Sequence, residues 1–413
     1  MAGHPVRPLA ADAGGVGYVD EPAVGYATPQ TERAASAGRL FGLAGVAGAV
    51  VLAAGVVAGV DRAWAGWLLA SVGVLTTGLA GLLFVAILYA SGASWGVAFR
   101  RAPEALSAAI PIGGAALLAL VVFAPYGYPW AHGHEFHGGD LANFKRAWLS
   151  WPFFAARAVV YVVVWMAFAR AIIGHSHRQD QDADAARSIR NIRLSIAFLV
   201  AFAVTFSLAS FDWIMSIEPE WYSTIFGIYN FAGLFSGGLA SIVLLVVWLQ
   251  RGPLKHVVTE QHLHDLGKLL FAFCTFWMYI WFSQYMLIWY ANIPEETTYY
   301  IARTRGAYEV LFSVNMVLNW VVPFFALLRR GPKKRSELIV KVAVVVLLGR
   351  WLDLYMMIVP PFSPSGPPFG LWEIAAILAM VGVAVWVALR ALGRARLVPV
   401  NDPRLDESLH YHA

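Results

Sequence analysis

The chain has 413 residues, of which 59% are hydrophobic and only 13% charged, and its formal net charge is +5. A water-soluble protein of this length carries more charged residues and shorter apolar runs, so the composition excludes the ordinary soluble classes. The sequence predicts an all-α polytopic membrane protein. Its positive charge is explained below by membrane orientation and gives no reason to expect nucleic acid as a partner.

Ten apolar stretches follow one another along the chain, each close to the ~20 residues that a spanning helix needs. We expect residues 1–39 to be a disordered cytoplasmic tail, residues 40–395 to form the transmembrane domain, and residues 396–413 to be a second cytoplasmic tail of similar character. The ten predicted helices cover residues 40–60, 64–90, 107–125, 149–173, 193–215, 222–250, 267–291, 306–328, 337–359 and 370–392.

The predicted helices are interpreted as two successive four-helix bundles with one further helix on each flank. Helices two to five (about 64–215) form the first bundle, and helices six to nine (about 222–359) form the second. A short repeat favours this division, because Asp212-Trp-Ile-Met215 ends the fifth helix and Asp353-Leu-Tyr-Met356 lies in the ninth. Repeated units are common in membrane proteins, and sites often lie where the repeats meet.

Basic residues are distributed unevenly between the two sides of the predicted spans. With the N-terminus placed in the cytoplasm, the inner loops and tails hold 22 Lys and Arg residues, and the outer loops hold five. Short cytoplasmic loops carry such an excess of basic residues. We therefore expect a multi-pass protein with both termini in the cytoplasm.

Five ionisable residues lie within the predicted spans or at their mouths. A charge at a helix centre costs ~2.5–3.5 kcal/mol on insertion scales, so these residues indicate an interior that handles protons, ions or a polar headgroup. They are Arg157, Asp212, Glu309, Arg350 and Asp353.

The two aspartates lie at matching depths, each ~16–18 residues and about 25 Å from the inner end of its helix. Arg350 precedes Asp353 by three residues, so their side chains share a face and can pair. The candidates for a proton path are Asp212, Asp353, Arg157, Arg350, Glu309, Thr205 and Ser216. In the structural alternative, Asp212 only caps its helix or pairs with Arg157 or Arg350.

The polar residues near Asp212 also suit a quinone headgroup, whose carbonyls need hydrogen-bond donors and whose reduced hydroxyls need acceptors. Tyr229 and Asn230 open the next helix on the same side of the membrane. His137 lies in an outer loop, where a histidine can receive a proton. The candidates for binding quinone or menaquinone are Tyr229, Asn230, Trp213 and His137.

The sequence offers few ligands for a redox metal. None of the eleven histidines falls inside a predicted span, whereas haem within a helical bundle usually takes histidine ligands from the helices. Cys274 is the single cysteine, and an iron–sulfur cluster needs about four. The run from His132 to Asp140 matches no zinc template and is interpreted as an interfacial loop. We expect no metal and no redox centre bound by this chain.

Three blocks of sequence resemble a known family. They are Ser210-Phe-Asp-Trp-Ile-Met-Ser-Ile-Glu-Pro-Glu-Trp-Tyr-Ser-Thr-Ile-Phe-Gly227, the stretch from Trp277 to Glu296, and Gly349-Arg-Trp-Leu-Asp353. They resemble the NrfD/PsrC-like polytopic membrane subunits, and are most similar to the second such subunit of bacterial alternative complex III, a quinol:electron-acceptor oxidoreductase. The resemblance covers roughly residues 40–395.

The resemblance implies a subunit of the bacterial inner (cytoplasmic) membrane. Its implied partners are an iron–sulfur subunit, haem c subunits and a second NrfD-like polytopic subunit, so the haem c groups and iron–sulfur clusters belong to the partners. The quinol-oxidising subunit of the family is expected to use a histidine with an acidic residue, and here no histidine lies in a predicted span. The sequence therefore favours a role in assembly and proton translocation over direct quinol oxidation.

Two other classes of function remain open at this point. The paired aspartates and the repeat also suit a proton-coupled secondary transporter, although we see no pair of helices broken at corresponding midplane positions. A purely structural membrane anchor is the third reading. Purification separates them, because a transporter comes out alone whereas a subunit brings haem c and iron–sulfur partners.

Overall fold

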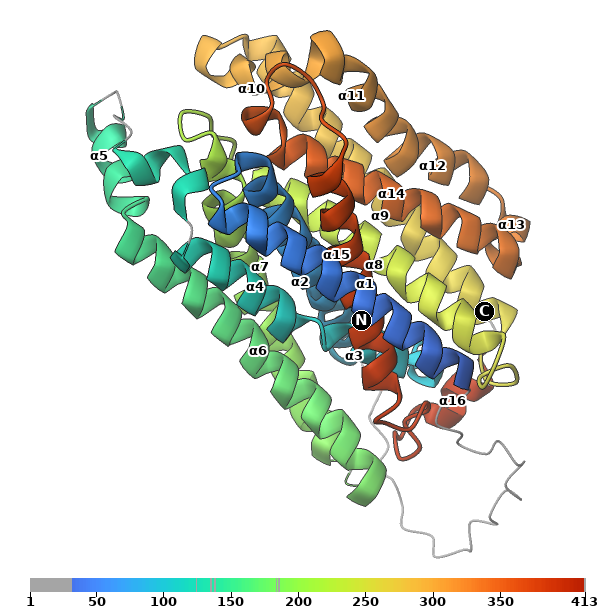
Figure 1. The fold of residues 1–413 in the computed structure, drawn as a ribbon. Helices are drawn as coiled ribbons and strands as arrows, with labels where there is room; N and C mark the ends of the chain where they lie inside the picture. Colours follow the sequence, from blue (N-terminus) through green and yellow to red (C-terminus); the bar gives the residue numbers. More distant parts are fainter. Residues whose placement is uncertain are drawn as a thin grey trace, which may run out of the picture.

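The computed structural model describes residues 32–123, 125–133, 136, 139–182, 184 and 186–411, and long helices dominate this part of the chain (Figure 1). Within it, nine helical segments are long and apolar enough to cross a membrane. The prediction of an all-α polytopic membrane protein is confirmed. The segments contain α1 (Glu32–Val57), α2 (Asp61–Ser91), α3 (Arg101–Ser107) with α4 (Ile110–Phe123), α6 (Trp151–Asp182), α7 (Ala186–Trp213), α8 (Phe226–Gln250), α9 (Glu260–Ala291), α11 (Glu309–Met316) with α12 (Val322–Leu327), and α15 (Leu371–Leu392).

A tenth long helix, α14 (Ser336–Ile358), corresponds to the predicted ninth span. It is as long as several of the others, but Lys341, Arg350 and Asp353 make it less apolar. Its second half is almost continuously buried, from Leu352 to Ile358. This helix therefore carries Arg350 and Asp353 into the protein interior, whereas Lys341 is exposed.

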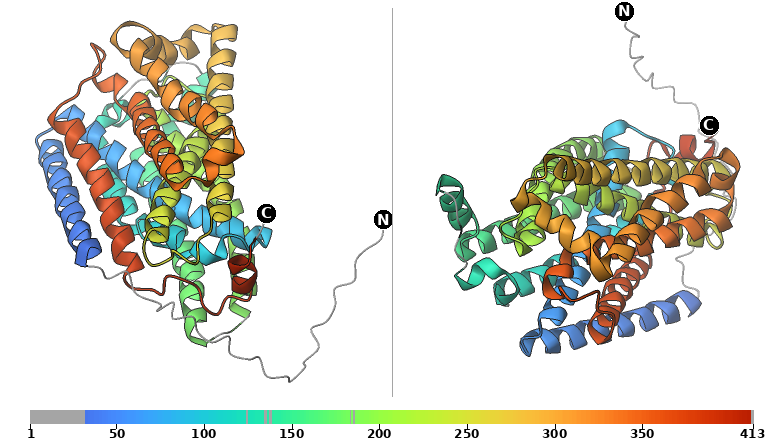
Figure 2. Two further views of the ribbon diagram at one scale, coloured as in Figure 1. Left: turned by 90° about the vertical axis from the view of Figure 1, so that its right-hand side faces the viewer. Right: turned by 90° about the horizontal axis from the view of Figure 1, so that it is seen from above.

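Two groups of four spans pack as the sequence predicts. In the first group α2 contacts α4 and α7, and α6 contacts both α4 and α7. In the second group α8 contacts α9 and α14, while α12 contacts α9 and α14. The groups meet where α2 and α7 contact α8, and α1 and α15 lie together at one edge (Figure 2).

The α1–α15 pair is held by close approach of small residues. A Cβ atom at Gly45 would collide with the backbone of α15 at Gly382 and Val383, and a Cβ at Gly48 would collide with Ala375 and Ala379. Small residues allow helix backbones to approach closely within a membrane, where association depends on packing. Glycine spacing on α1 therefore explains why this otherwise lipid-exposed helix stays attached.

Helix boundaries differ from the predicted ones because hydropathy locates the hydrocarbon layer, whereas a helix continues beyond it. Helix α1 begins at Glu32, and residues 1–31 of the predicted tail lie outside the described residues. Helix α6 runs on to Asp182, so His175 and His177 lie in its last turns. Helix α9 begins at Glu260, so His262 and His264 lie in its first turns.

Shorter helices connect the spans at both ends of the bundle. They are η1 (Val97–Phe99), η2 (Pro125–Gly127), η3 (Pro129–His132), α5 (Gly139–Trp148), η4 (Met215–Ile217), α10 (Pro294–Thr304), η5 (Gly306–Tyr308), α13 (Arg330–Lys334), η7 (Pro360–Phe362) and α16 (Leu405–Leu409).

Two spans are interrupted at prolines. Helices α3 and α4 are separated just before Pro111, and a π-helical segment, η6 (Val317–Val321), joins α11 to α12 just before Pro323. Proline lacks the amide hydrogen that a continuous helix needs. Both prolines lie inside candidate membrane spans, Pro111 in Arg101–Val122 and Pro323 in Gly306–Leu327. The interrupted spans are the second of one bundle and the third of the other, so they do not correspond.

The segment after α15 folds back over the helix ends, contrary to the expectation of a disordered tail. The Ser408 hydroxyl accepts a hydrogen bond from the amide of Ala98 (3.0 Å) and donates one to the carbonyl of Trp95 (3.1 Å). The His262 ring lies 3.2 Å from the Ser408 carbonyl oxygen. These contacts are single hydrogen bonds to backbone atoms, which produce no periodic pattern of apolar residues. The composition of the segment therefore did not predict them.

Candidate functional site

Asp212 stands near the C-terminal end of α7 and is 1% exposed. Its carboxylate accepts two hydrogen bonds from the Arg157 guanidinium, at 2.9 and 2.8 Å, one from the Trp148 indole at 2.8 Å and one from the Tyr161 hydroxyl at 3.0 Å. Arg157 and Tyr161 lie one turn apart on α6, so a single helix face supplies both donors. Each of the two carboxylate oxygens of Asp212 therefore accepts two hydrogen bonds from protein groups.

Arg157 is held from several sides. Its third nitrogen donates to the Trp148 carbonyl at 2.9 Å, and its guanidinium lies 4.0 Å from the ring centroid of Trp148 and 4.3 Å from that of Phe153. Stacking on aromatic faces suits the planar guanidinium, which is less strongly hydrated than an ammonium. The structural alternative, in which Asp212 pairs with Arg157, thus describes the geometry of this cluster.

Asp353 occupies a comparable place in the second bundle and is 0% exposed. Its carboxylate accepts a hydrogen bond from Arg350 at 2.7 Å, from the Trp277 indole at 3.2 Å, from the Asn315 amide at 3.2 Å and from the hydroxyl of Tyr229. The predicted pairing of Arg350 with Asp353 is confirmed. Three neighbouring spans, α8, α9 and α11, converge on the charged pair of α14.

Glycines make room for this charged pair. A Cβ atom at Gly233 would collide with the guanidinium of Arg350, and a Cβ at Gly237 would press on its aliphatic stem. Gly233 and Gly237 have the four-residue spacing typical of helix packing in membranes, and here they pack against a side chain. Gly59 follows Gly55 with the same spacing, but it lies in the turn after α1 with φ of +73°.

Buried polar atoms near Asp353 lack partners. The Nε and Nη2 atoms of Arg350 and the Oδ1 atom of Asn319 have no hydrogen-bond partner among the described residues. On α9, Gln284 is 2% exposed, and neither its Oε1 nor its Nε2 atom has a partner there. Native proteins nearly always satisfy such groups, often with ordered water. Arg350 is therefore less completely satisfied by protein than Arg157, each of whose three nitrogen atoms has a partner.

Three of the remaining residues predicted near Asp212 lie around its cluster. Ser216 donates to the Asp212 backbone carbonyl, and Thr205 accepts from the Trp165 indole at 2.9 Å. Trp213 packs its ring against Tyr161, with ring centroids 5.9 Å apart, and its buried indole nitrogen has no described partner. These residues surround the first cluster without touching the carboxylate of Asp212.

Tyr229 belongs to the Asp353 cluster, so the predicted grouping of Tyr229 and Asn230 with Asp212 is wrong. Asn230 is buried and donates to the carbonyl of Phe226 in its own helix, at 3.4 Å. Glu309 is exposed at the start of α11 and does not join the cluster. His137 lies outside the described residues. Tyr229 follows Asp212 closely in the sequence, but its side chain points into the second bundle, and the order of the helices does not predict this direction.

A third set of buried charges lies at the opposite end of the helices, where the sequence showed few. Glu104 accepts hydrogen bonds from Arg100 at 3.2 Å, Arg101 at 2.5 Å and Ser176 at 2.6 Å. The His177 ring nitrogen lies 3.3 Å from its carboxylate. We call Arg100, Arg101, Glu104, Ser176 and His177 the Glu104 cluster.

Two further acids complete the Glu104 cluster from outside. Arg100 donates to Asp402 of the C-terminal segment at 2.6 Å, and Arg101 donates to Asp180 of α6 at 2.5 Å. Sequence reasoning used the two arginines only as an orientation signal and overlooked Glu104. The available signal was its spacing, because Glu104 follows them by three and four residues, as helical ion pairs do.

At the far end of the bundle, Arg303 caps α14. It donates to the carbonyl oxygens of Met356 at 2.7 Å and Met357 at 3.2 Å, and to the Glu218 carboxylate at 2.6 Å. Basic side chains satisfy the free carbonyls of a helix C-terminus in this way. Burial raises the pKa of Tyr299, which stacks on Arg303, to about 12, against the opposing charge of Arg303.

Among the described residues, no group of three or more His, Cys, Asp or Glu side chains is arranged to hold a metal ion. No protein-family model matches the chain, and no curated protein matches it significantly. The fold and the geometry of the clusters therefore carry what can be said of this protein. It is an all-α multi-pass membrane protein with buried arginine–carboxylate clusters at both ends of its spans.

Proposed function

We propose that this chain is a membrane subunit of a quinol:electron-acceptor oxidoreductase of the alternative complex III type. Three sequence blocks similar to the NrfD/PsrC-like subunits support the proposal, and two of their residues, Arg350 and Asp353, form a buried pair. In this proposal the chain lies in a bacterial inner membrane with both termini in the cytoplasm. It binds no redox centre, and its partners are an iron–sulfur subunit, haem c subunits and a second NrfD-like subunit.

Within such a complex, the chain supports assembly and carries protons through the Asp353 cluster. The observation that carries this role is the group of unpartnered polar atoms on Arg350, Asn319 and Gln284. Such atoms need water in a buried setting, and water is what a proton requires to reach a carboxylate. The π-helical segment that places Asn319 beside Gly349 adds support, since such segments are frequent at functional sites.

Asp212 has a structural role in this proposal. Its four hydrogen-bond donors saturate the carboxylate, and Arg157 is itself held by Trp148 and Phe153. Asp353 also accepts four hydrogen bonds, but its partner Arg350 keeps two nitrogen atoms without partners among the described residues, so we assign the proton-carrying role to the Asp353 cluster.

Quinone binding receives less support than proton transfer. The hydroxyl of Tyr229 is used by Asp353, and the amide of Asn230 is used by its own helix backbone. Of the predicted quinone-binding residues that the structure describes, Trp213 alone has a buried polar atom with no hydrogen-bond partner at all. One indole nitrogen is a small share of the polar contacts that orient a headgroup in its site.

Purification from the native membrane tests the assignment to a complex. A tagged chain should bring with it subunits that show the absorbance of haem c and the electron paramagnetic resonance of iron–sulfur clusters. A chain that purifies alone and still exchanges a solute for protons in vesicles would identify a secondary transporter. A chain that purifies with non-redox partners only would support the anchor.

Proton transfer is tested in the intact complex reconstituted into vesicles. Asp353→Asn should lower the ratio of protons moved to electrons transferred while the haem and cluster signals persist. Glu309→Gln is the matched control, because it removes an exposed carboxylate from the same bundle. An unchanged ratio in Asp353→Asn, in a fully assembled complex, removes Asp353 from the path.

A further inference from the structure

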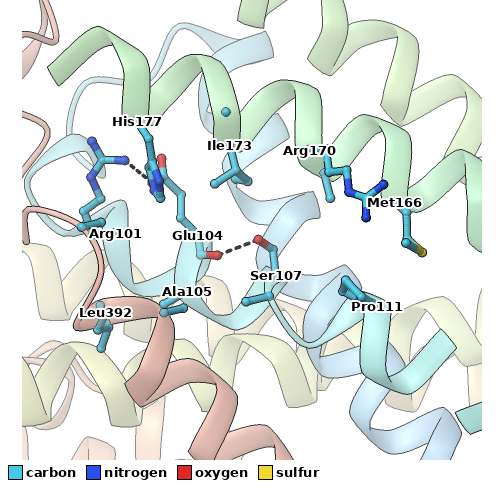
Figure 3. Close-up of a pocket in the computed structure, with 15 residues that line it drawn as sticks. Arg101, Glu104, Ala105, Ser107, Pro111, Met166, Arg170, Ile173, His177 and Leu392 are labelled. Atoms are coloured by element: carbon cyan, nitrogen blue, oxygen red, sulfur yellow. Dashed lines mark hydrogen bonds and ion pairs between the residues drawn. The ribbon is translucent and has the colours of Figure 1, made fainter. Parts of the chain in front are cut away.

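A cavity of about 320 Å³ lies beside the Glu104 cluster, between α3, α4, α6 and α15 (Figure 3). Its size falls within the ~300–1,000 Å³ of small-molecule sites. Arg101 and His177 lie at one end of the labelled face, and Arg170 lies with Met166 at the other. Much of the rest of the lining is apolar, including Ile173, Leu392 and Pro111.

The charged groups of the lining are not all used by protein. Arg101 is 2% exposed, and its Nε atom has no hydrogen-bond partner among the described residues. Arg170 is an exposed residue that lines the cavity, and within the described part of the chain its guanidinium has no hydrogen-bond or ion-pair partner. The one acid in the lining, Glu104, already accepts from three donors. The cavity therefore offers an anion two guanidinium groups with free donors.

The depth of the cavity matches the headgroup region of a bilayer. Arg170 is the twentieth residue of α6, so it lies about 28 Å along the helix from Trp151, close to the ~30 Å thickness of the hydrocarbon layer. His177 lies about 10 Å further along the same helix. The cavity thus extends from the hydrocarbon boundary into the polar layer.

We propose that this cavity holds the phosphate of an anionic phospholipid between Arg101 and Arg170, with an acyl chain leaving past Met166 toward the membrane interior. Basic pockets between membrane helices on the cytoplasmic side bind such headgroups. The apolar walls favour a lipid over a free phosphate ion, because an inorganic anion gains nothing from Ile173 or Leu392. This site does not depend on the proposed role in electron transport.

The experiment uses the full chain in the assembly in which it purifies. The protein is washed with detergent, returned to nanodiscs of phosphatidylcholine with or without phosphatidylglycerol, and the retained lipid is counted by native mass spectrometry. Arg170→Gln should weaken phosphatidylglycerol retention about fivefold. Arg178→Gln removes an exposed arginine from the same helix outside the cavity and should leave retention unchanged.

A second variant protects the test from a folding failure. Ala395→Trp fills the cavity from the loop after α15, keeps every arginine and should also abolish retention. Phosphatidylglycerol retention at the wild-type level in both Arg170→Gln and Ala395→Trp overturns the proposal. If inorganic phosphate alone stabilises the washed protein and no lipid is retained, the site binds a free anion and the lipid assignment is wrong.

Discussion

Asp212 and Asp353 lie in different bundles, yet each accepts hydrogen bonds from one arginine, one tyrosine and one tryptophan. The donors come from different helix positions in the two cases. Arg157 crosses from α6 to α7, whereas Arg350 precedes Asp353 on the same helix. The same chemistry is therefore assembled twice by different routes, and the arginine of the second assembly, Arg350, keeps two nitrogen atoms without partners among the described residues.

The Arg350–Asp353 pair should show strong coupling. Asp353→Ala leaves the Arg350 charge buried and alone, a loss of about 3–5 kcal/mol when one partner of a buried pair is removed. Arg350→Ala/Asp353→Ala removes both charges and should be less destabilised than Asp353→Ala. Thermal unfolding in detergent measures both, and additive effects would show that the two residues do not stabilise each other.

Asp212→Asn separates structural from proton-carrying roles. The change leaves Arg157 without its anionic partner, so the melting temperature should fall clearly. The proton-to-electron ratio of the assembled complex should stay at the wild-type value, in contrast to Asp353→Asn. A lowered ratio with normal stability would place Asp212 on the path after all.

Gly233→Ala should disturb the second cluster without altering any polar group. The added methyl group meets the Arg350 guanidinium, which must move away from Asp353. We expect a lower melting temperature and a lower proton-to-electron ratio together. Gly252→Ala, where the nearest atoms lie 3.8 Å away, is the control and should behave as wild type.

Gly48→Val should separate α1 from α15. The new side chain would meet the backbone of α15 at Ala375 and Ala379, which cannot move aside as a flexible side chain can. Protease sensitivity of the loop between α1 and α2 should rise. Ala47→Val adds the same bulk on the exposed face of α1 and should leave that loop protected.

The C-terminal segment should detach from α9 at high pH. Tyr411 donates a 2.6 Å hydrogen bond to Asp265, which together with burial raises the pKa of Tyr411 to about 12. Because an unfolded tyrosine has a pKa of ~10, this contact stabilises the docked segment below pH ~10 and is lost as the pH rises toward 12. The tyrosinate absorbance difference between wild type and Tyr411→Phe should titrate near pH 12, and a transition near pH 10 would contradict docking.

Local patterns predicted the fold and part of the site. Long apolar runs gave the spans, and a three-residue spacing gave the Arg350–Asp353 pair, because both depend on neighbours along one helix. The partner of Asp212 was one of two alternatives, since Arg157 lies on another helix. Tyr229 was assigned to the wrong aspartate for the same reason.

Residues at the ends of helices were the hardest to interpret. Arg100 and Arg101 look like ordinary loop charges until Glu104 and Asp402 are placed beside them by folding. Ser408 contributes hydrogen bonds to backbone atoms, which have no sequence signature. The composition of a segment predicts whether it lies in water or in lipid. It does not predict which helix end the segment packs against.

The placement of Ser408 has a consequence for biosynthesis. This residue closes over Trp95 and Ala98, which follow the second helix to be synthesised, so that closure must wait until the last span has left the ribosome. A product cut short after α15 would insert its spans yet leave Arg100 without Asp402. The hydrogen bonds of Ser408 therefore make the ordering of this end of the helices depend on synthesis of the segment that follows the last span.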